Sequence, residues 1–179
     1  MAVLVLYATV EGQTRKIAEH VAARIEGLGH MVVLGDVRDP GFAVPGTFEA
    51  IVLCAPIHMG RYPEAFVRFV TDWKTAIEAV PNALVSVSLA IHSDDATERA
   101  EAEAYPTHLE HKSGYHPASV HHAAGALKYL EYDFFKRSLM RRIAGKEGGP
   151  VDVSRDHELT DWAALDQFID GFAGQIAQQ

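Results

Sequence analysis

The sequence predicts an α/β fold, a doubly wound five-stranded parallel sheet with helices on both faces. Five apolar runs, each about the length of a strand, alternate with segments in which apolar residues recur at helical spacing. A loop rich in hydroxyl groups, residues 8–14, joins the first apolar run to the first helical segment. Five strands at this spacing favour the order 2-1-3-4-5, in a single domain that covers residues 1–179 and carries an insertion around residues 127–150.

The predicted strands are near-continuous apolar runs, which is the pattern of strands buried on both faces of a sheet. They cover residues 2–8, 31–34, 50–55, 83–90 and 119–124. The last of them is the weakest of the five. Strands that alternate with helices imply a parallel sheet covered on both faces.

The predicted helices lie between the strands. Residues 14–28 carry apolar residues at helical spacing, and Gly29 ends the helix. Pro63 opens the next helix in its first turn, where a missing N–H does no harm. Residues 97–110 are polar and charged, and they predict an exposed helix.

The last helix starts after Thr160 or Asp161, either of which can cap it. Its apolar residues recur at helical spacing and therefore share one face. They are Trp162, Leu165, Phe168, Ile169, Phe172 and Ile176.

The loop between the first strand and the first helix has the features of an anion site. It consists of Thr9, Val10, Glu11, Gly12, Gln13 and Thr14. Backbone N–H groups at the start of a helix are unpaired, and the helix dipole adds about half a positive charge there. The two threonines can add hydroxyl donors and Gln13 an amide donor, while Gly12 lets the backbone approach a ligand closely. The expected ligand is a phosphate group.

The same residues exclude two common phosphate loops. No Lys followed by Ser or Thr ends a glycine-rich run, so this is not a nucleoside triphosphate loop, and no G-x-G-x-x-G dinucleotide fingerprint is present. The Thr-x-x-Gly-Gln-Thr pattern of residues 9–14 instead resembles the flavodoxin family, whose loop at this junction binds the phosphate of FMN. The alternative is an ordinary strand-to-helix turn in which Thr14 caps the helix.

A second loop follows the third strand and would meet the first loop at the carboxyl edge of the sheet. Under the flavodoxin resemblance it lines the isoalloxazine ring, and it consists of Pro56, Ile57, His58, Met59, Gly60, Arg61 and Tyr62. Gly60 can adopt unusual backbone angles, so that a backbone amide or carbonyl near the flavin N5 suits one redox state. Tyr62 could stack on the ring, or be a half-buried aromatic residue that starts a helix. The other side chains could cover the ring edge, or His58 and Arg61 could be solvated loop residues.

The loop after the fourth strand is expected to form the other wall of the ring site. Its first residues are Ser88, Leu89 and Ala90. We assign no side chain as catalytic acid or base, because the cofactor would carry most of the chemistry. Five histidines lie between residues 108 and 122, but no cysteine or carboxylate set completes a site, so no metal is expected. The absence of a Gly-x-Ser-x-Gly motif argues against a serine hydrolase.

Composition and charge narrow the class of protein. The formal net charge of −8 at pH 7 argues against a nucleic-acid partner. The single cysteine, Cys54, rules out an internal disulfide, suits a reducing cytoplasm and is expected in the core. No apolar stretch approaches the roughly 18 residues of a membrane span, and the N-terminal run lacks the basic leader of a signal peptide. We therefore expect a cytoplasmic protein, with peripheral contact to the inner face of the cell membrane left open.

Aromatic and basic residues interleave in the insertion at residues 127–150. The segment holds six Lys or Arg and three Asp or Glu, a local charge of +3 in an acidic chain. Such a segment, which we expect to be helical, suits an interface with a membrane surface, a partner protein or an anionic substrate. The alternative is an edge insertion folded onto the core with its basic residues in water.

Several further segments sharpen the resemblance. Together with the two loops, Gly125–Tyr129, Gly148-Gly149 and Thr160-Asp161-Trp162 look like the flavodoxin-type, menaquinone-dependent protoporphyrinogen oxidases of bacterial haem synthesis. The resemblance covers nearly the whole chain. It implies FMN as cofactor, dehydrogenation of protoporphyrinogen IX to protoporphyrin IX, and transfer of electrons to a respiratory quinone, menaquinone or ubiquinone. Candidates to pair with substrate propionates or lipid phosphates are Lys136, Arg137, Arg141 and Arg142.

Two other functions fit the same residues. An electron-transfer flavodoxin would bind FMN, use a protein redox partner and perform no substrate chemistry. A flavin-free interaction module would use only the fold. The sequence also leaves open whether the chain forms a homo-oligomer.

Overall fold

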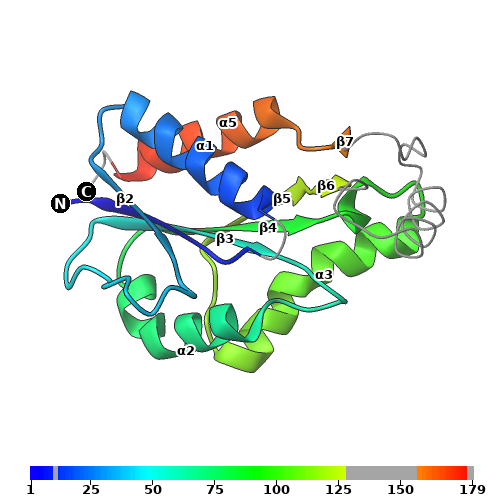
Figure 1. The fold of residues 1–179 in the computed structure, drawn as a ribbon, viewed down its shortest axis with the longest axis horizontal. Coiled ribbons are helices and arrows are strands. Elements are labelled where there is room, and N and C mark those ends of the chain that lie inside the picture. Colours follow the sequence, from blue (N-terminus) through cyan, green and yellow to red (C-terminus); the bar gives the residue numbers. More distant parts are fainter. Residues whose placement is uncertain (10–11, 128–156, 177–179) are drawn as a thin grey trace.

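Five parallel strands form one sheet in the order β2-β1-β3-β4-β5, as the sequence predicts (Figure 1). The computed structural model of the chain describes residues 1–9, 12–127 and 157–176. The strands of the sheet are β1 (Val3–Tyr7), β2 (Val32–Asp36), β3 (Ala50–Pro56), β4 (Asn82–Ser88) and β5 (Ser119–Ala124). Val5 of β1 is paired with Leu34 on one side and Val52 on the other, so β1 lies inside the sheet.

Helices cover both faces of the sheet (Figure 1). The helices α1 (Gln13–Gly27) and α5 (Trp162–Ile176) lie side by side on one face. The helices α2 (Glu64–Glu78) and α3 (Ala96–Ser113) lie on the other, and a short 3₁₀ turn, η1 (Ala90–His92), precedes α3. This is the doubly wound arrangement that the alternation of strands and helices predicts.

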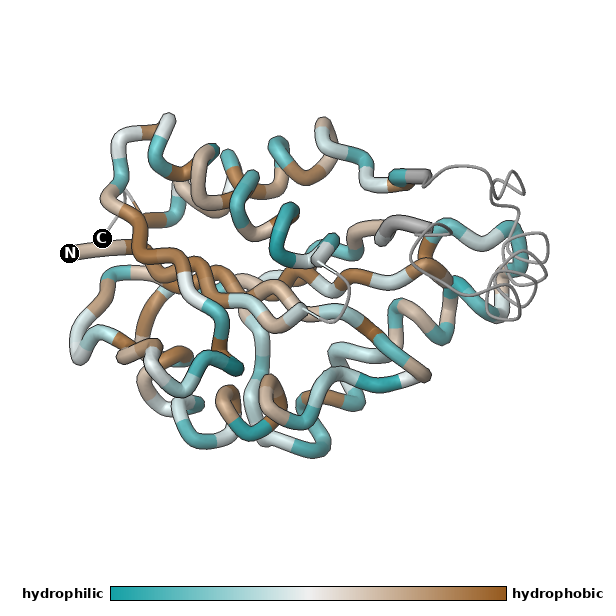
Figure 2. Tube along the Cα trace, viewed as in Figure 1, coloured by the Kyte–Doolittle hydropathy of each residue, from teal (hydrophilic) through white to brown (hydrophobic). Residues whose placement is uncertain are grey.

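Each face of the sheet buries its own apolar layer. Side chains alternate along a strand, so Val3 and Val5 belong to the layer under α1 and α5, whereas Leu4 and Leu6 belong to the layer over α2 and α3. All residues of β1 are buried, and the strands form the apolar centre of Figure 2. Full burial of such a side chain stabilises the fold by about 1.5–3 kcal/mol.

Most element boundaries differ from the prediction by one to three residues, and three of the differences have a clear structural reason. The second strand runs from Val32 to Asp36, because Val3 of β1 sets the start of the pairing at Val32. The fourth strand ends at Ser88, since the chain turns into η1 immediately afterwards. Pro63 is the residue before α2, with extended backbone angles (φ −57°, ψ 139°), and not the first residue of the helix.

The prediction of an exposed helix over residues 97–110 is wrong about its exposure. The helix α3 buries Ala102, Tyr105 and Leu109 against the sheet layer that contains Leu84. These residues are three and four positions apart and therefore share one face. The surrounding charged residues hide this spacing in the sequence, because they make the segment polar on average.

A second, two-stranded sheet lies between β5 and α5 and was not predicted. The strand β6 (Ala126–Leu127) pairs antiparallel with β7 (His157–Glu158). The pairing places Leu127 opposite His157, so the chain leaves and returns at adjacent points around the insertion. Residues 128–156 lie outside the described residues, and so does the helix expected there.

Candidate functional site

The loops after β1, β3 and β4 meet at one edge of the sheet. Parallel pairing aligns Tyr7 at the end of β1 with Cys54 of β3, and Pro56 at the end of β3 with Val87 of β4. All three strands therefore end at the same edge, at the point where the strand order reverses. Ligands of open parallel sheets bind in the crevice at this point.

The junction between β1 and α1 presents an uncapped helix start to this edge. Gly12, at the N-cap position, has left-handed backbone angles (φ 89°), which a residue with a Cβ adopts only under strain. Its N–H donates to Oγ1 of Thr9 at 2.9 Å. Among the described residues no side chain caps the helix, and its first turn holds no acidic residue. Free N–H groups and the positive end of the helix dipole are the features that favour an anion, so the expected phosphate site stays a prediction at this junction.

The side chains of the loop have distinct surroundings. Thr9 accepts the Gly12 N–H and so keeps its own hydroxyl proton available for a ligand. Thr14 is 2% exposed and lies within the helix, so the alternative in which it caps the helix is wrong. Gln13 donates its side-chain amide to Oγ1 of Thr160 at 3.0 Å. Val10 and Glu11 lie outside the described residues.

The loop after β3 is a tight two-residue hairpin. The backbones of His58 and Arg61 exchange both hydrogen bonds, at 3.0 and 3.3 Å. Met59 (φ 51°) and Gly60 (φ 74°) between them both have left-handed angles, which is the pattern of a type I′ turn. Gly60 meets the expectation of unusual backbone angles. The strained Met59, 85% exposed at the tip, had no signal in the sequence.

Tyr62 lies under this hairpin and not at its surface. Its side chain is 5% exposed, packs against Phe66 and donates its hydroxyl to Oγ of Ser86 at 2.7 Å. Burial raises the pKa of this hydroxyl well above its ordinary value. A ring with so little free surface is placed to support the loop, so the structure favours the buried interpretation over stacking. His58 and Arg61 are exposed.

The loop after β4 starts at a buried residue. Ser88 is 7% exposed; its carbonyl accepts the N–H of Gly125 and its Oγ accepts that of Ile91. Leu89 and Ala90 follow, half-buried, as the chain turns into η1. They lie at the same edge as the hairpin, as expected for a second wall. Their contact with a ligand remains a prediction.

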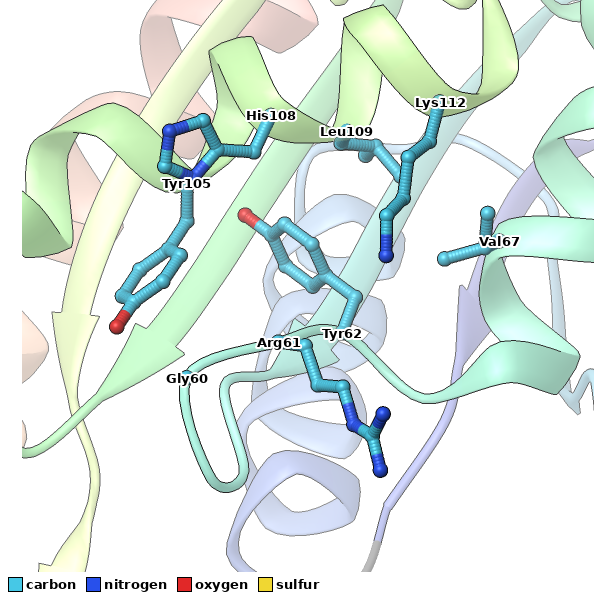
Figure 3. Close-up of a pocket in the computed structure, with 8 residues that line it drawn as sticks. All are labelled: Gly60, Arg61, Tyr62, Val67, Tyr105, His108, Leu109 and Lys112. Carbon is cyan, nitrogen blue, oxygen red and sulfur yellow. The ribbon is translucent and has the colours of Figure 1, made fainter.

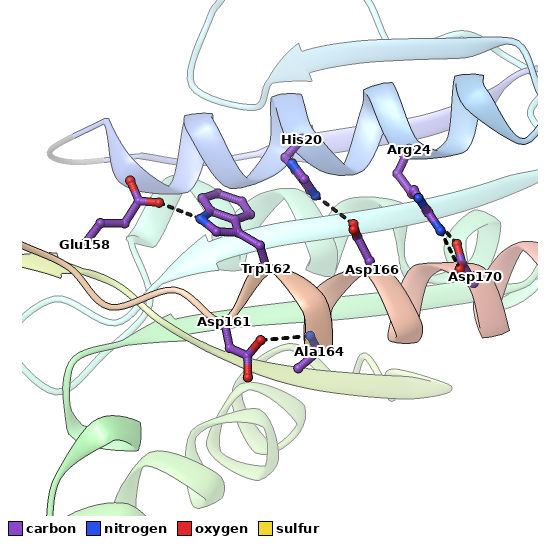
Figure 4. Close-up of polar contacts among 8 residues, drawn as sticks. All are labelled: His20, Arg24, Glu158, Asp161, Trp162, Ala164, Asp166 and Asp170. Atoms are coloured by element: carbon purple, nitrogen blue, oxygen red, sulfur yellow. Dashed lines mark hydrogen bonds and ion pairs between the residues drawn. The ribbon is translucent and has the colours of Figure 1, made fainter.

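Polar contacts join α1 to the segment that starts α5 (Figure 4). Glu158 accepts hydrogen bonds from Lys16 and, at 2.6 Å, from Nε1 of Trp162. The hydrogen bond to Lys16 is the main reason that the pKa of Glu158 lies below its ordinary value. Further along, His20 contacts Asp166 at 2.7 Å. The start of α1 is thus held against the returning end of the insertion.

The start of α5 resolves the choice between two caps. Oδ1 of Asp161 accepts the N–H of Ala164 at 3.0 Å, so Asp161 caps the helix. Thr160 instead donates to the carbonyl of Ala124 at 2.8 Å and accepts from Gln13. Sequence reasoning missed this role of Thr160, because its partners are distant in the sequence.

Comparison with known proteins agrees with this geometry. Residues 4–154 match a family model described as a flavodoxin domain. The chain belongs to the flavodoxin family.

Two curated relatives of this flavodoxin-family chain carry the same name. A Leishmania major protein named protoporphyrinogen IX dehydrogenase (quinone) is 31% identical over 171 residues, which are 95% of this chain and 74% of the relative. An Escherichia coli protein of that name is 28% identical over 177 residues, 99% of this chain and 95% of the relative. The matches therefore include the segment of the insertion.

Solved flavodoxins share the fold. A flavodoxin from the domain Archaea aligns with a TM-score of 0.56 at 13% identity, over 99% of each chain. A Fusobacterium nucleatum flavodoxin mutant, described as bound to flavin mononucleotide, aligns with a TM-score of 0.50 at 14% identity, over 99% of this chain and 95% of that one. At these identities the likeness concerns the fold alone.

Neither an exposed thiol nor a metal-binding cluster occurs among the described residues. Cys54 is fully buried, as expected for a core residue, and burial raises the pKa of its thiol to about 12. The described residues hold no group of three or more His, Cys, Asp or Glu side chains that could bind a metal ion. In the same part of the chain no helix is both long and apolar enough to cross a bilayer.

Proposed function

We propose that this chain is an FMN-dependent oxidoreductase that dehydrogenates protoporphyrinogen IX and passes the electrons to a quinone. The observation that carries the proposal is the uncapped start of α1 beside the type I′ hairpin at one sheet edge. The near full-length match to relatives named for this reaction supports the choice of substrate and acceptor.

The residues at the edge fit FMN. Its phosphate would accept the N–H groups of the first turn of α1 and the hydroxyl of Thr9. Thr14, Gln13 and two residues outside the described ones, Val10 and Glu11, would complete this end of the proposed site. The isoalloxazine ring would lie between the hairpin, residues 56–61, and the turn at residues 88–90. Tyr62 would hold the hairpin in place from beneath through Ser86.

In this proposal the protein orients the flavin and the substrate and supplies little acid–base chemistry of its own. Bound FMN supplies the electron acceptor for hydride equivalents from the substrate and the donor for the quinone. The left-handed angles at Met59 and Gly60 would let the hairpin offer a backbone group to the ring. The buried hydroxyl of Tyr62 and thiol of Cys54 are withdrawn from proton transfer, since burial raises the pKa of both.

The basic residues of the insertion belong to the same proposal. Lys136, Arg137, Arg141 and Arg142, outside the described residues, would pair with substrate propionates or with lipid phosphates at the inner face of the cell membrane. Replacing the four by Gln tests this, with sedimentation of the holoprotein on vesicles of anionic lipid as the measurement. Wild-type protein should sediment and the variant should not; equal sedimentation would remove the membrane contact from the proposal.

Anaerobic reduction of the bound flavin tests the proposed reaction. Protoporphyrinogen IX, mixed with the yellow holoprotein without oxygen, should bleach the flavin absorbance and yield protoporphyrin IX. Menaquinone or ubiquinone, added next, should restore the absorbance. If the flavin stayed oxidised, the proposed dehydrogenase activity would be rejected. A long-lived one-electron state of the flavin in a redox titration would instead identify an electron carrier.

A further inference from the structure

A cavity lies between the hairpin, α2 and α3 (Figure 3). Its volume is about 170 Å³. Eight residues line it: Gly60, Arg61, Tyr62, Val67, Tyr105, His108, Leu109 and Lys112. Gly60 and Arg61 belong to the hairpin that would line the flavin ring, and Tyr62 lies directly beneath it, so the cavity adjoins the proposed cofactor site.

The walls of the cavity are apolar. Tyr62, Tyr105 and Leu109 are 5%, 7% and 1% exposed, and Val67 is half-buried. Tyr105 donates its hydroxyl to Glu101 at 3.3 Å, so this polar group is already engaged. A ligand that enters here would rest its apolar part on two aromatic rings and two aliphatic side chains.

The rim of the cavity carries two cations, Arg61 and Lys112, and the imidazole of His108. Arg61, His108 and Lys112 are exposed, and no acidic side chain is among the lining residues. Among the described residues none of the three has a carboxylate within 4.0 Å, whereas Arg15, Arg24 and Arg38 all do. In Figure 3 the ammonium of Lys112 extends from α3 toward the hairpin and the ring of Tyr62. Arg61 and Lys112, which lack carboxylate partners within the described part of the chain, lie beside apolar walls. In a chain of net charge −8 this arrangement favours an anionic ligand.

The volume limits the size of that ligand. Pockets for drug-sized molecules measure about 300–1,000 Å³, and a cavity of about 150 Å³ holds a single benzene ring. At about 170 Å³ this cavity accepts one ring or one short alkyl chain. A whole tetrapyrrole does not fit, but a single carboxylate arm of one does.

We propose that this cavity binds a carboxylate on a small apolar body, with Lys112 as its main cationic partner. In the second part of the proposal, which rests on the proposed function, the carboxylate is a side arm of the porphyrinogen. The cavity would then fix the substrate beside the hairpin and hence beside the flavin. A free monocarboxylate is the other source of the same chemistry.

Binding of benzoate to the FMN-loaded protein tests the first part. Titration followed by ¹H–¹⁵N NMR should shift the amides of Gly60 and Leu109, and Lys112→Gln should raise the Kd at least fivefold. Lys74→Gln is the matched control: it removes the same charge from α2, next to Gly114 and outside the cavity lining, and should change the Kd less than twofold. Benzyl alcohol should bind at least fivefold more weakly than benzoate. Equal binding of the two compounds, or equal effects of the two variants, would overturn the proposal.

Steady-state kinetics test the second part. Lys112→Gln should raise the KM for protoporphyrinogen at least fivefold, with a smaller effect on kcat and an FMN affinity like that of Lys74→Gln. Benzoate should compete with protoporphyrinogen. Benzoate could bind as expected without competing with protoporphyrinogen, while Lys112→Gln leaves the KM for protoporphyrinogen unchanged. The cavity would then take a free carboxylate, and the assignment to a side arm of the substrate would be overturned. If benzoate binds but protoporphyrinogen does not reduce the flavin, the proposed function fails and the carboxylate site stands.

Discussion

The side-chain amide of Gln13 donates a hydrogen bond to the hydroxyl of Thr160, a residue 147 positions further along the chain. The hydroxyl of Thr160 in turn donates a hydrogen bond to the carbonyl of Ala124 at the end of β5. Beside it, Lys16 and Glu158 form an ion pair. The start of α1, next to the loop expected to bind phosphate, is therefore tied to residues on both sides of the insertion.

Removing the hydroxyl of Thr160 should weaken both the fold and the loop. Thr160→Val keeps the shape but leaves the Gln13 amide and the Ala124 carbonyl without this partner. We expect a loss of about 1–2 kcal/mol in the free energy of unfolding and a rise of roughly fivefold in the Kd for FMN, about 1 kcal/mol. Urea denaturation and flavin fluorescence titration measure the two effects.

The control for this variant is Thr71→Val. The Thr71 hydroxyl also donates to a backbone carbonyl, that of Val67, but on the exposed side of α2. It should leave FMN binding unchanged. Equal Kd values for the Thr160 and Thr71 variants would show that the link to Gln13 does not position the loop.

The tip of the hairpin carries strain that a substitution can relieve. Met59 is held at φ 51°, which costs about 1 kcal/mol for a residue with a Cβ. Asn before Gly is the preferred pair for this turn, so Met59→Asn should raise the free energy of unfolding by about 1 kcal/mol. Met59→Ala removes the same exposed side chain and keeps the strain, so it should change the stability little. Similar midpoints of urea denaturation for the two variants would contradict this assignment of the strain.

The half-buried histidines of β5, His121 and His122, should make the protein sensitive to acid. Burial, and then the neighbouring His122, hold the pKa of His121 below its ordinary value of 6.5, although Asp161 acts in the opposite direction. Burial also lowers the pKa of His122. The unfolded chain therefore takes up protons at a higher pH than the folded chain, so stability should fall as the pH drops through about 6.5 and below.

Replacement of His121 by Phe isolates this effect. The ring of His121 already packs against Phe168, with 5.1 Å between ring centroids, so an aromatic residue suits the site. The variant should lose less stability than wild type between pH 7 and pH 5, in thermal unfolding followed by circular dichroism. His111→Gln, on the exposed side of α3, should keep the wild-type dependence. If His121→Phe left the loss of stability between pH 7 and pH 5 unchanged, the acid sensitivity would come from other groups.

Apolar burial and surface ion pairs contribute very differently to the attachment of α5. Phe172 is 2% exposed in the layer shared with α1, and Phe172→Ala should lower the free energy of unfolding by about 3–5 kcal/mol. Asp170, two positions away, forms a bidentate ion pair with Arg24 at the surface. Water and salt screen such a pair, so Asp170→Asn should have a far smaller effect. A larger loss for Asp170→Asn in urea denaturation would contradict this ranking.

Local patterns in the sequence predict most of the fold. The apolar run of β1 and the helical spacing of α1 depend on neighbours in the chain, and both elements lie where expected. The strand order follows from the repeated strand–helix alternation. The prediction that α3 is exposed was wrong. Tyr105 and Leu109 stand among charged residues in the sequence, and their burial depends on contact with the sheet.

Within the candidate site, the sequence indicated which loops are involved but not the side-chain contacts that hold them. The helix start at Gly12 and the turn at Gly60 were visible, since glycine marks positions that need left-handed angles. The burial of Tyr62 was undecided, because its partner Ser86 belongs to another strand. The link between Gln13 and Thr160 depends on the tertiary fold and leaves no local trace.

The central claim is that the junction of β1 and α1 binds the phosphate of FMN, and comparing FMN with riboflavin tests it most directly. The two ligands share the ring system and differ in the phosphate. Fluorescence titration of the apoprotein should give a Kd for FMN about 100-fold below that for riboflavin, about 2.7 kcal/mol, and Gly12→Val should abolish the difference. Equal affinity for the two ligands, or no binding of FMN, would contradict the account.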